Sequence, residues 1–284
     1  MTNNRTWIRI LVLLFAFALV AAGCGSDDDD DNGGATTTVA TGGTDGGGGG
    51  DGLAAAQAAV DANATPPTDI GPTVPLDSVP ETKTVAWLEC ELPSCLDITP
   101  GFEAATDALG WELLPISVQS FDPAPGFQQA IDAGVDYVAL TGTPAALVQD
   151  QIDAAAAAGI GFMSCFSTDA PGGEANNIWI QCGDGDSTFA TGNLIAQWAI
   201  ADSGGAANTL MVNIRDFPVL VSEEEGAKAA YDANCPDCSF EVLNVTLDQF
   251  VGGEVPAAVA SQLQSNPDIN YIHFSFADIP LGVA

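Results

Sequence analysis

From residue 84 to the end of the chain, short apolar runs alternate with longer segments of helical periodicity. The apolar runs predict strands at residues 85–88, 111–118, 137–140, 161–164, 178–180, 209–214, 240–245 and 271–274. The intervening segments predict helices at residues 101–109, 125–133, 145–158, 187–201, 221–233 and 255–264. Because such alternation is typical of βαβ units with right-handed crossovers, we expect an α/β fold with mainly parallel sheets.

Proline and glycine support the ends of these helices. Pro123 and Pro144 stand where two of them begin, and Gly110, Gly134 and Gly159 follow the ends of three. Proline is tolerated in the first turn of a helix, and glycine adopts the left-handed conformation that often ends one.

The helix at residues 187–201 is the longest of the second half. Phe189, Leu194, Ile195 and Trp198 are spaced so that they share one face of it. We therefore expect these four side chains to form its buried face.

The alternation stops near Cys182 and restarts after it, which predicts two lobes, at residues 84–182 and 183–284. The second block has fewer strands than the first, and the sequence ends where another helix would begin. The second α/β block is therefore shorter than the first.

Residues 1–24 have the character of an export signal. Arg5 and Arg9 precede an uncharged apolar run at residues 10–22, which is shorter than the roughly 20 residues of a spanning helix. The run ends in AAGC, which resembles the bacterial lipobox, and this resemblance implies diacylglycerol attachment at Cys24. The expected location is the outer face of the bacterial cytoplasmic membrane, with the lipid as the membrane contact. An ordinary secretory signal or an uncleaved anchor is the alternative.

Residues 25–83 predict a tether. Residues 25–51 are mostly Asp, Gly and Thr and cannot bury enough apolar surface to fold. Residues 53–62 are rich in alanine and predict a short helix, and the prolines at residues 66–80 predict an extended strap. The aspartates at residues 27–31 lack the ligand spacing of a calcium loop and are interpreted as a solvated spacer.

Charge and composition narrow the function. The 38 acidic and 5 basic side chains give a net charge of −33, which disfavours binding to nucleic acid. The single histidine, His273, excludes sites that need several histidines, and we expect no metal and no cofactor. His273 lies in an apolar predicted strand, where a role in the core is favoured over catalysis.

Several segments resemble a known family. QAIDAGVDYVALTGTP at residues 129–144 looks like the third-strand region of type I periplasmic solute-binding proteins of the ribose-binding kind. Residues 151–162, EGAKAA at residues 225–230 and NPDINYI at residues 266–272 extend the match. The resemblance implies two Rossmann-like lobes that close around a small solute, with the first hinge crossing at Cys182-Gly183. It also implies a monomer that delivers its solute to the membrane permease of an ABC importer. The family has a further strand and helix in the second lobe and a return to the first, which this sequence lacks, so the resemblance implies an incomplete second lobe, as in a truncated gene product.

In parallel sheets, ligands bind beyond the carboxyl ends of the strands. In this chain the loops at those ends are residues 89–94, 141–143, 165–168, 215–217 and 275–278. The candidate ligand-binding residues are Glu91, Leu92, Ser94, Thr141, Phe166, Ser167, Asp184, Arg215, Phe217 and Phe276.

The chain departs from the sugar-binding pattern of the family it resembles. An aspartate–arginine pair of those relatives matches Phe166 and Ser167, an asparagine matches Phe276, and an arginine matches Val221. A pocket with Phe166, Phe217 and Phe276 would suit a flatter or more apolar solute that stacks on the rings. The alternative is that some of these phenylalanines belong to the core of a lobe.

Arg215 is the one strong cation expected near the cleft. It would meet an anionic group of the solute or pair with Asp216 or Glu91, and the pairing is favoured.

Cysteine content agrees with export. Of the seven cysteines, six remain beside Cys24, and spacing suggests the pairs Cys90–Cys95 and Cys235–Cys238. Cys165 and Cys182 remain, at the ends of strands expected to be neighbours in the first lobe, and are expected to form the third pair. The CPDC motif at residues 235–238 also looks like a redox dithiol, but it follows a predicted helix instead of beginning one. A structural disulfide is therefore expected there.

Three functions compete: a solute receptor of an importer, a receptor of the same fold that docks on a membrane sensor, and an extracytoplasmic enzyme. The sequence contains no Gly-x-Ser-x-Gly elbow and no P-loop, and its one histidine leaves no metal cluster. The enzyme is therefore disfavoured, and neighbouring genes would distinguish the two receptors.

Overall fold

A computed structural model describes residues 48–68 and 74–283. The predicted signal peptide, Cys24 and residues 25–47 of the predicted tether lie outside the described residues. Within the described ranges, no helix combines the length and the apolarity needed to cross a membrane.

The sheet of the first lobe has five parallel strands in the order β2-β1-β3-β4-β5. The strands are β1 (Thr84–Cys90), β2 (Glu112–Val118), β3 (Tyr137–Thr141), β4 (Gly161–Cys165) and β5 (Ile178–Cys182). The chain moves outward from β1 to β2 and then returns past β1 to β3, so the strand order reverses between β1 and β3. Such a reversal leaves a crevice at the carboxyl ends of the two strands.

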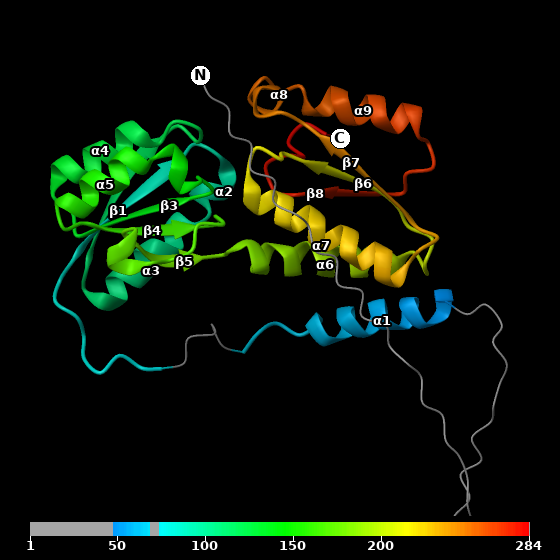
Figure 1. The fold of residues 1–284 in the computed structure, drawn as a ribbon, viewed down its shortest axis with the longest axis horizontal. Helices are drawn as coiled ribbons and strands as arrows, with labels where there is room; N and C mark the ends of the chain where they lie inside the picture. Colours follow the sequence, from blue (N-terminus) through cyan, green and yellow to red (C-terminus); the bar gives the residue numbers. More distant parts are fainter. Residues whose placement is uncertain (1–47, 69–73, 284) are drawn as a thin grey trace, which may run out of the picture. The chain divides into compact units, whose positions relative to one another are not determined.

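Helices cover both faces of this sheet (Figure 1). They are α2 (Pro93–Leu96), α3 (Thr99–Leu109), α4 (Ala124–Ala133), the 3₁₀ turn η1 (Ala145–Leu147), α5 (Gln149–Ala157) and the 3₁₀ turn η2 (Gly173–Ala175). Successive residues of β1 point to opposite faces, as in any strand. Leu88 therefore packs in one core with Phe127 of α4, whereas Trp87 packs in the other and stacks on Phe102 of α3.

The second lobe has a three-stranded parallel sheet in the order β7-β6-β8. Its elements are α6 (Gly185–Asp202), β6 (Asn208–Asn213), α7 (Pro218–Asn234), β7 (Ser239–Asn244), α8 (Leu247–Val251), α9 (Val255–Ser265) and β8 (Tyr271–Phe274). One core lies between the sheet and α9 and includes Val212 and Val259. A second core, with Ile200 and Ala227, lies where α6 and α7 pack together. The predicted α/β fold with parallel sheets is confirmed in both lobes.

The predicted helix at residues 145–158 is interrupted in the structure. Val148 has φ −130° and ψ 24°, which ends η1 before α5 begins. Its side chain is only 1% exposed and belongs to the core of the first lobe. The residue that interrupts the helix is thus one whose side chain is packed in the core. The short helices α2 and α8 were not predicted.

The prediction of the buried face of α6 is wrong. Phe189, Ile195 and Trp198 are exposed, and the buried face consists of smaller side chains such as Ala196. The reason is the close approach of α7: a Cβ added to Gly192 would lie 1.9 Å from the carbonyl oxygen of Glu223. Two helices this close leave no room for large side chains between them, so the aromatic residues lie outside the contact.

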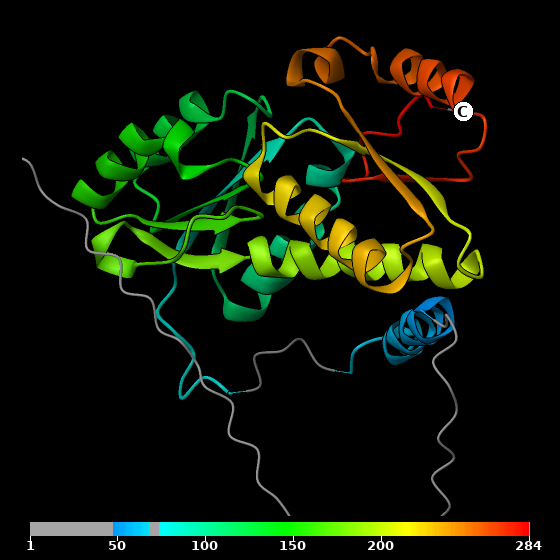
Figure 2. The same ribbon diagram turned by 45° about the vertical axis from the view of Figure 1, so that its right-hand side comes forward.

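A further helix, α1 (Gly48–Asn63), packs against α6 and α7 of the second lobe (Figures 1 and 2). Ala56 is fully buried there, and a Cβ on Gly52 would lie 2.2 Å from the carbonyl oxygen of Asn234. The sequence predicted a helix at residues 53–62 as part of a tether. The structure shows that this helix is longer and that it docks on the second lobe.

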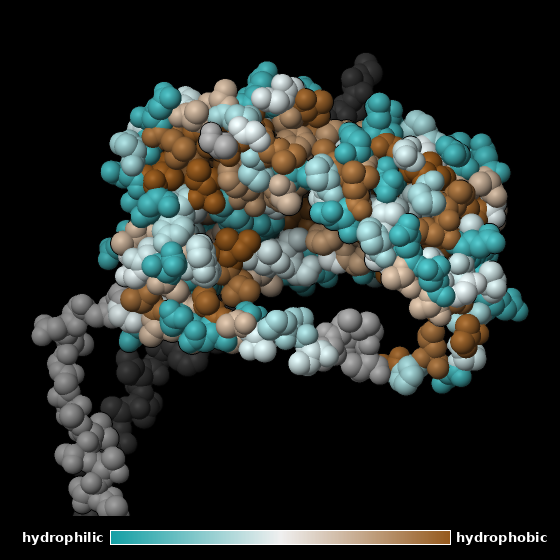
Figure 3. Space-filling view, turned by 180° about the vertical axis from the view of Figure 1, so that it is seen from behind, coloured by the Kyte–Doolittle hydropathy of each residue, from teal (hydrophilic) through white to brown (hydrophobic). Residues whose placement is uncertain are grey.

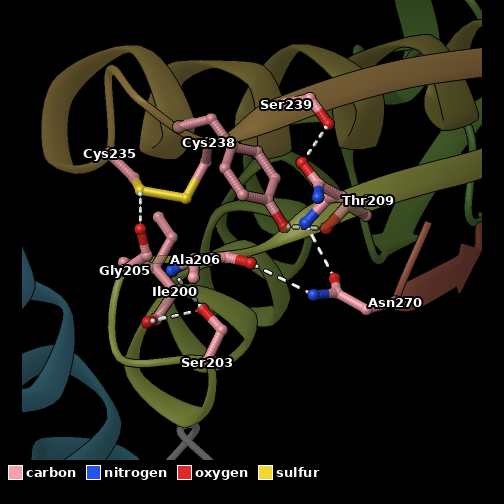
Figure 4. The surroundings of a disulfide bond; sticks show 11 residues. Ile200, Ser203, Gly205, Ala206, Thr209, Cys235, Cys238, Ser239 and Asn270 are labelled. Atoms are coloured by element: carbon pink, nitrogen blue, oxygen red, sulfur yellow. Dashed lines mark hydrogen bonds between the residues drawn. A yellow bond between two sulfur atoms is a disulfide. The ribbon is translucent and has the colours of Figure 1, made fainter. Parts of the chain in front are cut away.

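All three predicted disulfides are present, with Cα–Cα distances of 5.5 Å (Cys90–Cys95), 4.3 Å (Cys165–Cys182) and 5.3 Å (Cys235–Cys238). Cys235–Cys238 joins the C-terminal end of α7 to the start of β7 (Figure 4). Nearby hydrogen bonds, such as that between Thr209 Oγ1 and the hydroxyl of Tyr231 at 2.6 Å, lie at the amino ends of the strands. This cross-link therefore stands at the edge of the sheet opposite its carboxyl ends.

Candidate ligand cleft

A cavity of about 670 Å³ lies at the carboxyl ends of the strands, with walls from both lobes. Leu88 of β1 and Leu140 of β3 contribute from the first lobe, at the point where its strand order reverses. Ile272 of β8 and Leu220 of α7 contribute from the second lobe. Figure 3 shows this part of the molecule from behind, hollowed between the lobes and with hydrophobic residues around the hollow.

The two lobes are joined directly after β5. Gly183 has φ 78°, in the left-handed region that favours glycine, and a Cβ there would lie 3.0 Å from the ring of Phe166. Asp184 then begins α6 as its N-cap. Its carboxylate accepts a hydrogen bond from Ser187 N at 2.8 Å, and the Ser187 hydroxyl interacts with the Asp184 backbone in return.

Contacts between the lobes close the rim of the cavity. The carboxylate of Asp278, 2% exposed, accepts hydrogen bonds from Ser94 N at 3.3 Å and from the Ser94 hydroxyl. The ring of Phe121 lies 5.9 Å from that of Phe217 and 6.4 Å from that of Phe250. Polar and aromatic contacts thus join the lobes at two places.

The cavity wall is mostly apolar, and much of it is aromatic. The phenylalanines that line it are Phe121, Phe166, Phe217, Phe274 and Phe276. Phe166 has φ 49°, which is unusual for a residue with a side chain. Its amide donates to the carbonyl of Cys182 at 2.8 Å, so this hydrogen bond holds the strained backbone beside the cavity.

A few polar groups interrupt this apolar wall. His273 Nε2 lies 2.9 Å from Glu223 Oε1, and both side chains are buried. The hydroxyls of Ser120 and Ser275 are also buried, and within the described residues they have no hydrogen-bond partner.

The structure brings six of the ten sequence-predicted candidates together on this wall: Leu92, Ser94, Thr141, Phe166, Phe217 and Phe276. The remaining four lie outside it and are engaged elsewhere. Glu91 accepts a hydrogen bond from Ser120 N at 2.9 Å, and Ser167 shares one of 2.8 Å with Ser164. Asp184 caps α6, as described above.

Arg215 is paired, as the sequence favoured, but its partner is neither Asp216 nor Glu91. Its Nε donates to Glu224 Oε2 at 2.8 Å, and a second nitrogen contacts Oε1. These hydrogen bonds raise the pKa of Arg215. Burial of the Glu224 carboxyl opposes its ionisation, but hydrogen bonds from Arg215 and Asn213 outweigh burial and hold the pKa of Glu224 below its usual value.

Sequence reasoning missed Glu223, Ser120 and Ser275, and it placed His273 only in the core. A signal for Glu223 exists, because Glu223 shares a helical stripe with Val219 and Ala227, which are also buried. For the two serines, no local pattern distinguishes a hydroxyl beside a cavity from one in solvent.

No family model and no curated protein matches the chain. Solved structures do match. An ABC sugar transporter protein (periplasmic sugar-binding protein) from Legionella pneumophila has a TM-score of 0.59 at 17% identity, covering 70% of this chain and 74% of that one. A periplasmic solute-binding protein of an ABC transporter from Actinobacillus succinogenes has a TM-score of 0.60 at 18% identity, covering 71% and 72%.

A carbohydrate transporter protein from Acidothermus cellulolyticus has a TM-score of 0.55 at 21% identity, covering 71% of this chain and 68% of that one. Together these matches confirm the resemblance at the level of fold. The chain has the two-lobed α/β fold of type I periplasmic binding proteins.

Proposed function

We propose that this chain is an extracytoplasmic solute-binding protein that captures one small molecule between its lobes and delivers it to an ABC importer. The observation that carries the proposal is the 670 Å³ cavity at the carboxyl ends of both sheets, with walls from both lobes. Structural neighbours support it: two are named as solute-binding proteins of ABC transporters, one with bound D-allose and one with bound glycerol, and a third is named as a carbohydrate transporter with bound myo-inositol.

The geometry accounts for capture without chemistry on the solute. A solute in the cavity contacts side chains of both lobes at once, so it binds the closed arrangement better than an open one and shifts the population toward closure. A permease that recognises both lobes in the closed arrangement then receives the loaded protein. The receptor function needs no catalytic group.

Attachment to the membrane is proposed through a lipid on Cys24, on the strength of the lipobox resemblance. Since α1 docks on the second lobe, the segment that precedes it would connect the lipid to that lobe. Replacing Cys24 by alanine should release the protein from cell membranes into the medium, and unchanged retention of this variant would disprove the anchor.

Solute capture is tested by thermal unfolding of the purified full chain against sugars, polyols, nucleosides and aromatic metabolites. A bound solute at about a hundred times its dissociation constant stabilises the folded state by about 2.7 kcal/mol, which corresponds to a rise of several degrees in Tm. A Thr141→Trp variant, which places a large ring in the cavity, should lose this response, because Thr141 lies on the wall.

The matched control is Ser265→Trp, which places the same ring at an exposed position at the end of α9. It should keep the full response. A solute that stabilises the Thr141→Trp variant as well as the unmodified chain would show that binding occurs outside the cleft.

A further inference from the structure

A buried carboxylate–imidazole pair stands in the largely apolar wall of the cleft. Glu223 on α7 is 5% exposed and His273 on β8 is 7% exposed, and Glu223 Oε1 lies 2.9 Å from His273 Nε2. A carboxylate only accepts hydrogen bonds, so the imidazole donates through Nε2–H. The pair lines the cavity, in contrast to the other paired carboxylates of α7, Glu224 and Asp232.

The position of Glu223 is fixed by the backbone of the neighbouring helix. At Gly192 of α6, an added Cβ would lie 1.9 Å from the carbonyl oxygen of Glu223 and 2.9 Å from its Cγ. The reciprocal contact occurs at Gly226, where an added Cβ would lie 1.9 Å from the carbonyl oxygen of Phe189. Glu223 therefore has little freedom to turn away from the cavity.

The Glu223 carboxylate keeps acceptor capacity that the described residues do not use. His273 is its only hydrogen-bond partner among them, and it engages Oε1. Oε2 has no partner among the described residues and is not fully buried, so it is open to the cavity. A ligand that displaces water there would leave this oxygen without a hydrogen bond unless it donates one, so a hydrogen-bond donor of a ligand is favoured at Oε2. The unpartnered hydroxyls of Ser120 in the first lobe and Ser275 in the second also line the cavity and offer further hydrogen bonds to a polar ligand.

The cleft offers an anionic ligand no lysine or arginine to pair with. No lysine or arginine is among the lining residues, and each of the three basic side chains in the described part of the chain has a carboxylate partner already. The pairs are Lys83–Asp136, Arg215–Glu224 and Lys228–Asp232. The net charge of −33 adds long-range repulsion of anions.

We propose that the cleft, whose role rests on the proposed function, takes a compact aromatic amine. The protonated nitrogen donates to Glu223 Oε2, and the ring packs among Phe217, Phe274 and Phe276. His273 holds Oε1 and so orients the carboxylate. A free sugar, by contrast, would bury many hydroxyls against phenylalanines that offer them no hydrogen bonds.

Four probes with the purified full chain test the inference: 2-phenylethylamine, the uncharged 2-phenylethanol, the anion 3-phenylpropionate, and D-allose. At about ten times its dissociation constant, 2-phenylethylamine should raise the Tm by about 2 °C or more. We expect 2-phenylethanol to give a smaller shift and the other two none. Because the first three probes share a ring, this comparison needs no variant to fold.

Variants then test whether Glu223 is the residue that recognises the protonated amine. Glu223→Gln should remove the advantage of 2-phenylethylamine over 2-phenylethanol, whereas Glu225→Gln, an exposed position on the same helix, should leave it unchanged. The Thr141→Trp variant should lose the response to both probes.

Two results would overturn the inference and leave the proposed function standing. One is stabilisation by D-allose, but not by 2-phenylethylamine, that Thr141→Trp abolishes. The other is an equal response to 3-phenylpropionate and 2-phenylethylamine that Thr141→Trp abolishes. A response to 2-phenylethylamine that survives in Thr141→Trp would contradict both proposals, and so would the absence of any response to a probe or to any solute of the broader screen.

Discussion

Three consecutive glutamates on α7 have three different environments. Glu223 faces the cavity with His273, Glu224 pairs with Arg215, and Glu225 is exposed. Successive residues of a helix are rotated by about 100°, so adjacent identical side chains necessarily point in different directions. The chemistry of each carboxylate is therefore set by what lies on its side of the helix.

The pair Glu224–Arg215 has a testable effect on stability. Since the folded-state pKa of Glu224 is held below its usual value, ionised Glu224 stabilises the fold above that usual pKa, and the contribution disappears as pH falls through the lowered value. Glu224→Gln should lower the free energy of unfolding by about 1 kcal/mol at pH 7.

The measurement is urea unfolding of Glu224→Gln beside Glu225→Gln between pH 7 and pH 2. We expect the deficit of Glu224→Gln to shrink toward zero at the acid end, and Glu225→Gln to show little effect throughout. A deficit of constant size across this pH range would contradict the assigned role of the ionised carboxylate.

For single residues, the sequence predicted whether a side chain is paired or buried better than it predicted which residue that side chain contacts. Pairing of Arg215 was favoured, but Glu224 was not a candidate, because a spacing of nine residues across a turn and a helix start does not show which side chains meet. A buried His273 was expected, yet its partner comes from α7 and lies fifty residues away in sequence. Such contacts depend on how elements pack.

Helices and strands were predicted well where the signal is local. The strand order, however, depends on crossovers, and the buried face of α6 depends on the close approach of α7 at Gly192 and Gly226. The helical spacing of large apolar residues predicted burial of Phe189 and Trp198, but α6 and α7 contact each other through small residues. Docking of α1 was equally unpredicted, because an alanine-rich segment has no marked apolar face.

The α6–α7 contact gives a prediction at this scale. Gly192→Ala should lower the free energy of unfolding by about 1–3 kcal/mol, because its Cβ would collide with the backbone of Glu223 and force the helices apart. Since Glu223 moves with that backbone, the variant should also bind cleft ligands more weakly. Chemical denaturation and thermal-shift titration measure the two effects.

Gly101→Ala is the matched control, because Gly101 lies in α3 and a Cβ there meets nothing within 4 Å. It should raise the free energy of unfolding by about 0.5–1 kcal/mol, as replacement of a helical glycine usually does. Equal effects of the two alanines would show that helix propensity alone, and not the close contact, governs Gly192.

For the whole molecule, the location of the cleft could be predicted from the sequence, but the residues that line it could be predicted only in part. Parallel strands send their carboxyl ends to one edge, so the loops after β1, β3 and β8 could be assigned to a common site. The predicted aromatic residues Phe166, Phe217 and Phe276, which follow β4, β6 and β8, reach the wall as well. Glu223 lies within a helix instead of a loop, and a search confined to strand ends could not find it.

Closure of the lobes rests in part on the Ser94–Asp278 contact at the rim, since Asp278 accepts two hydrogen bonds from the opposite lobe. Asp278→Ala should shift the unliganded chain toward open arrangements, because hydrogen bonds to a charged group contribute about 1.5–3 kcal/mol. Small-angle X-ray scattering should show a larger radius of gyration, and affinity for a cleft ligand should fall about tenfold or more.

Asp216→Ala is the control, because Asp216 accepts only from Leu247 N within its own lobe. This variant should leave both quantities unchanged. Identical scattering from Asp278→Ala and the unmodified chain would mean that the contact does not hold the lobes together.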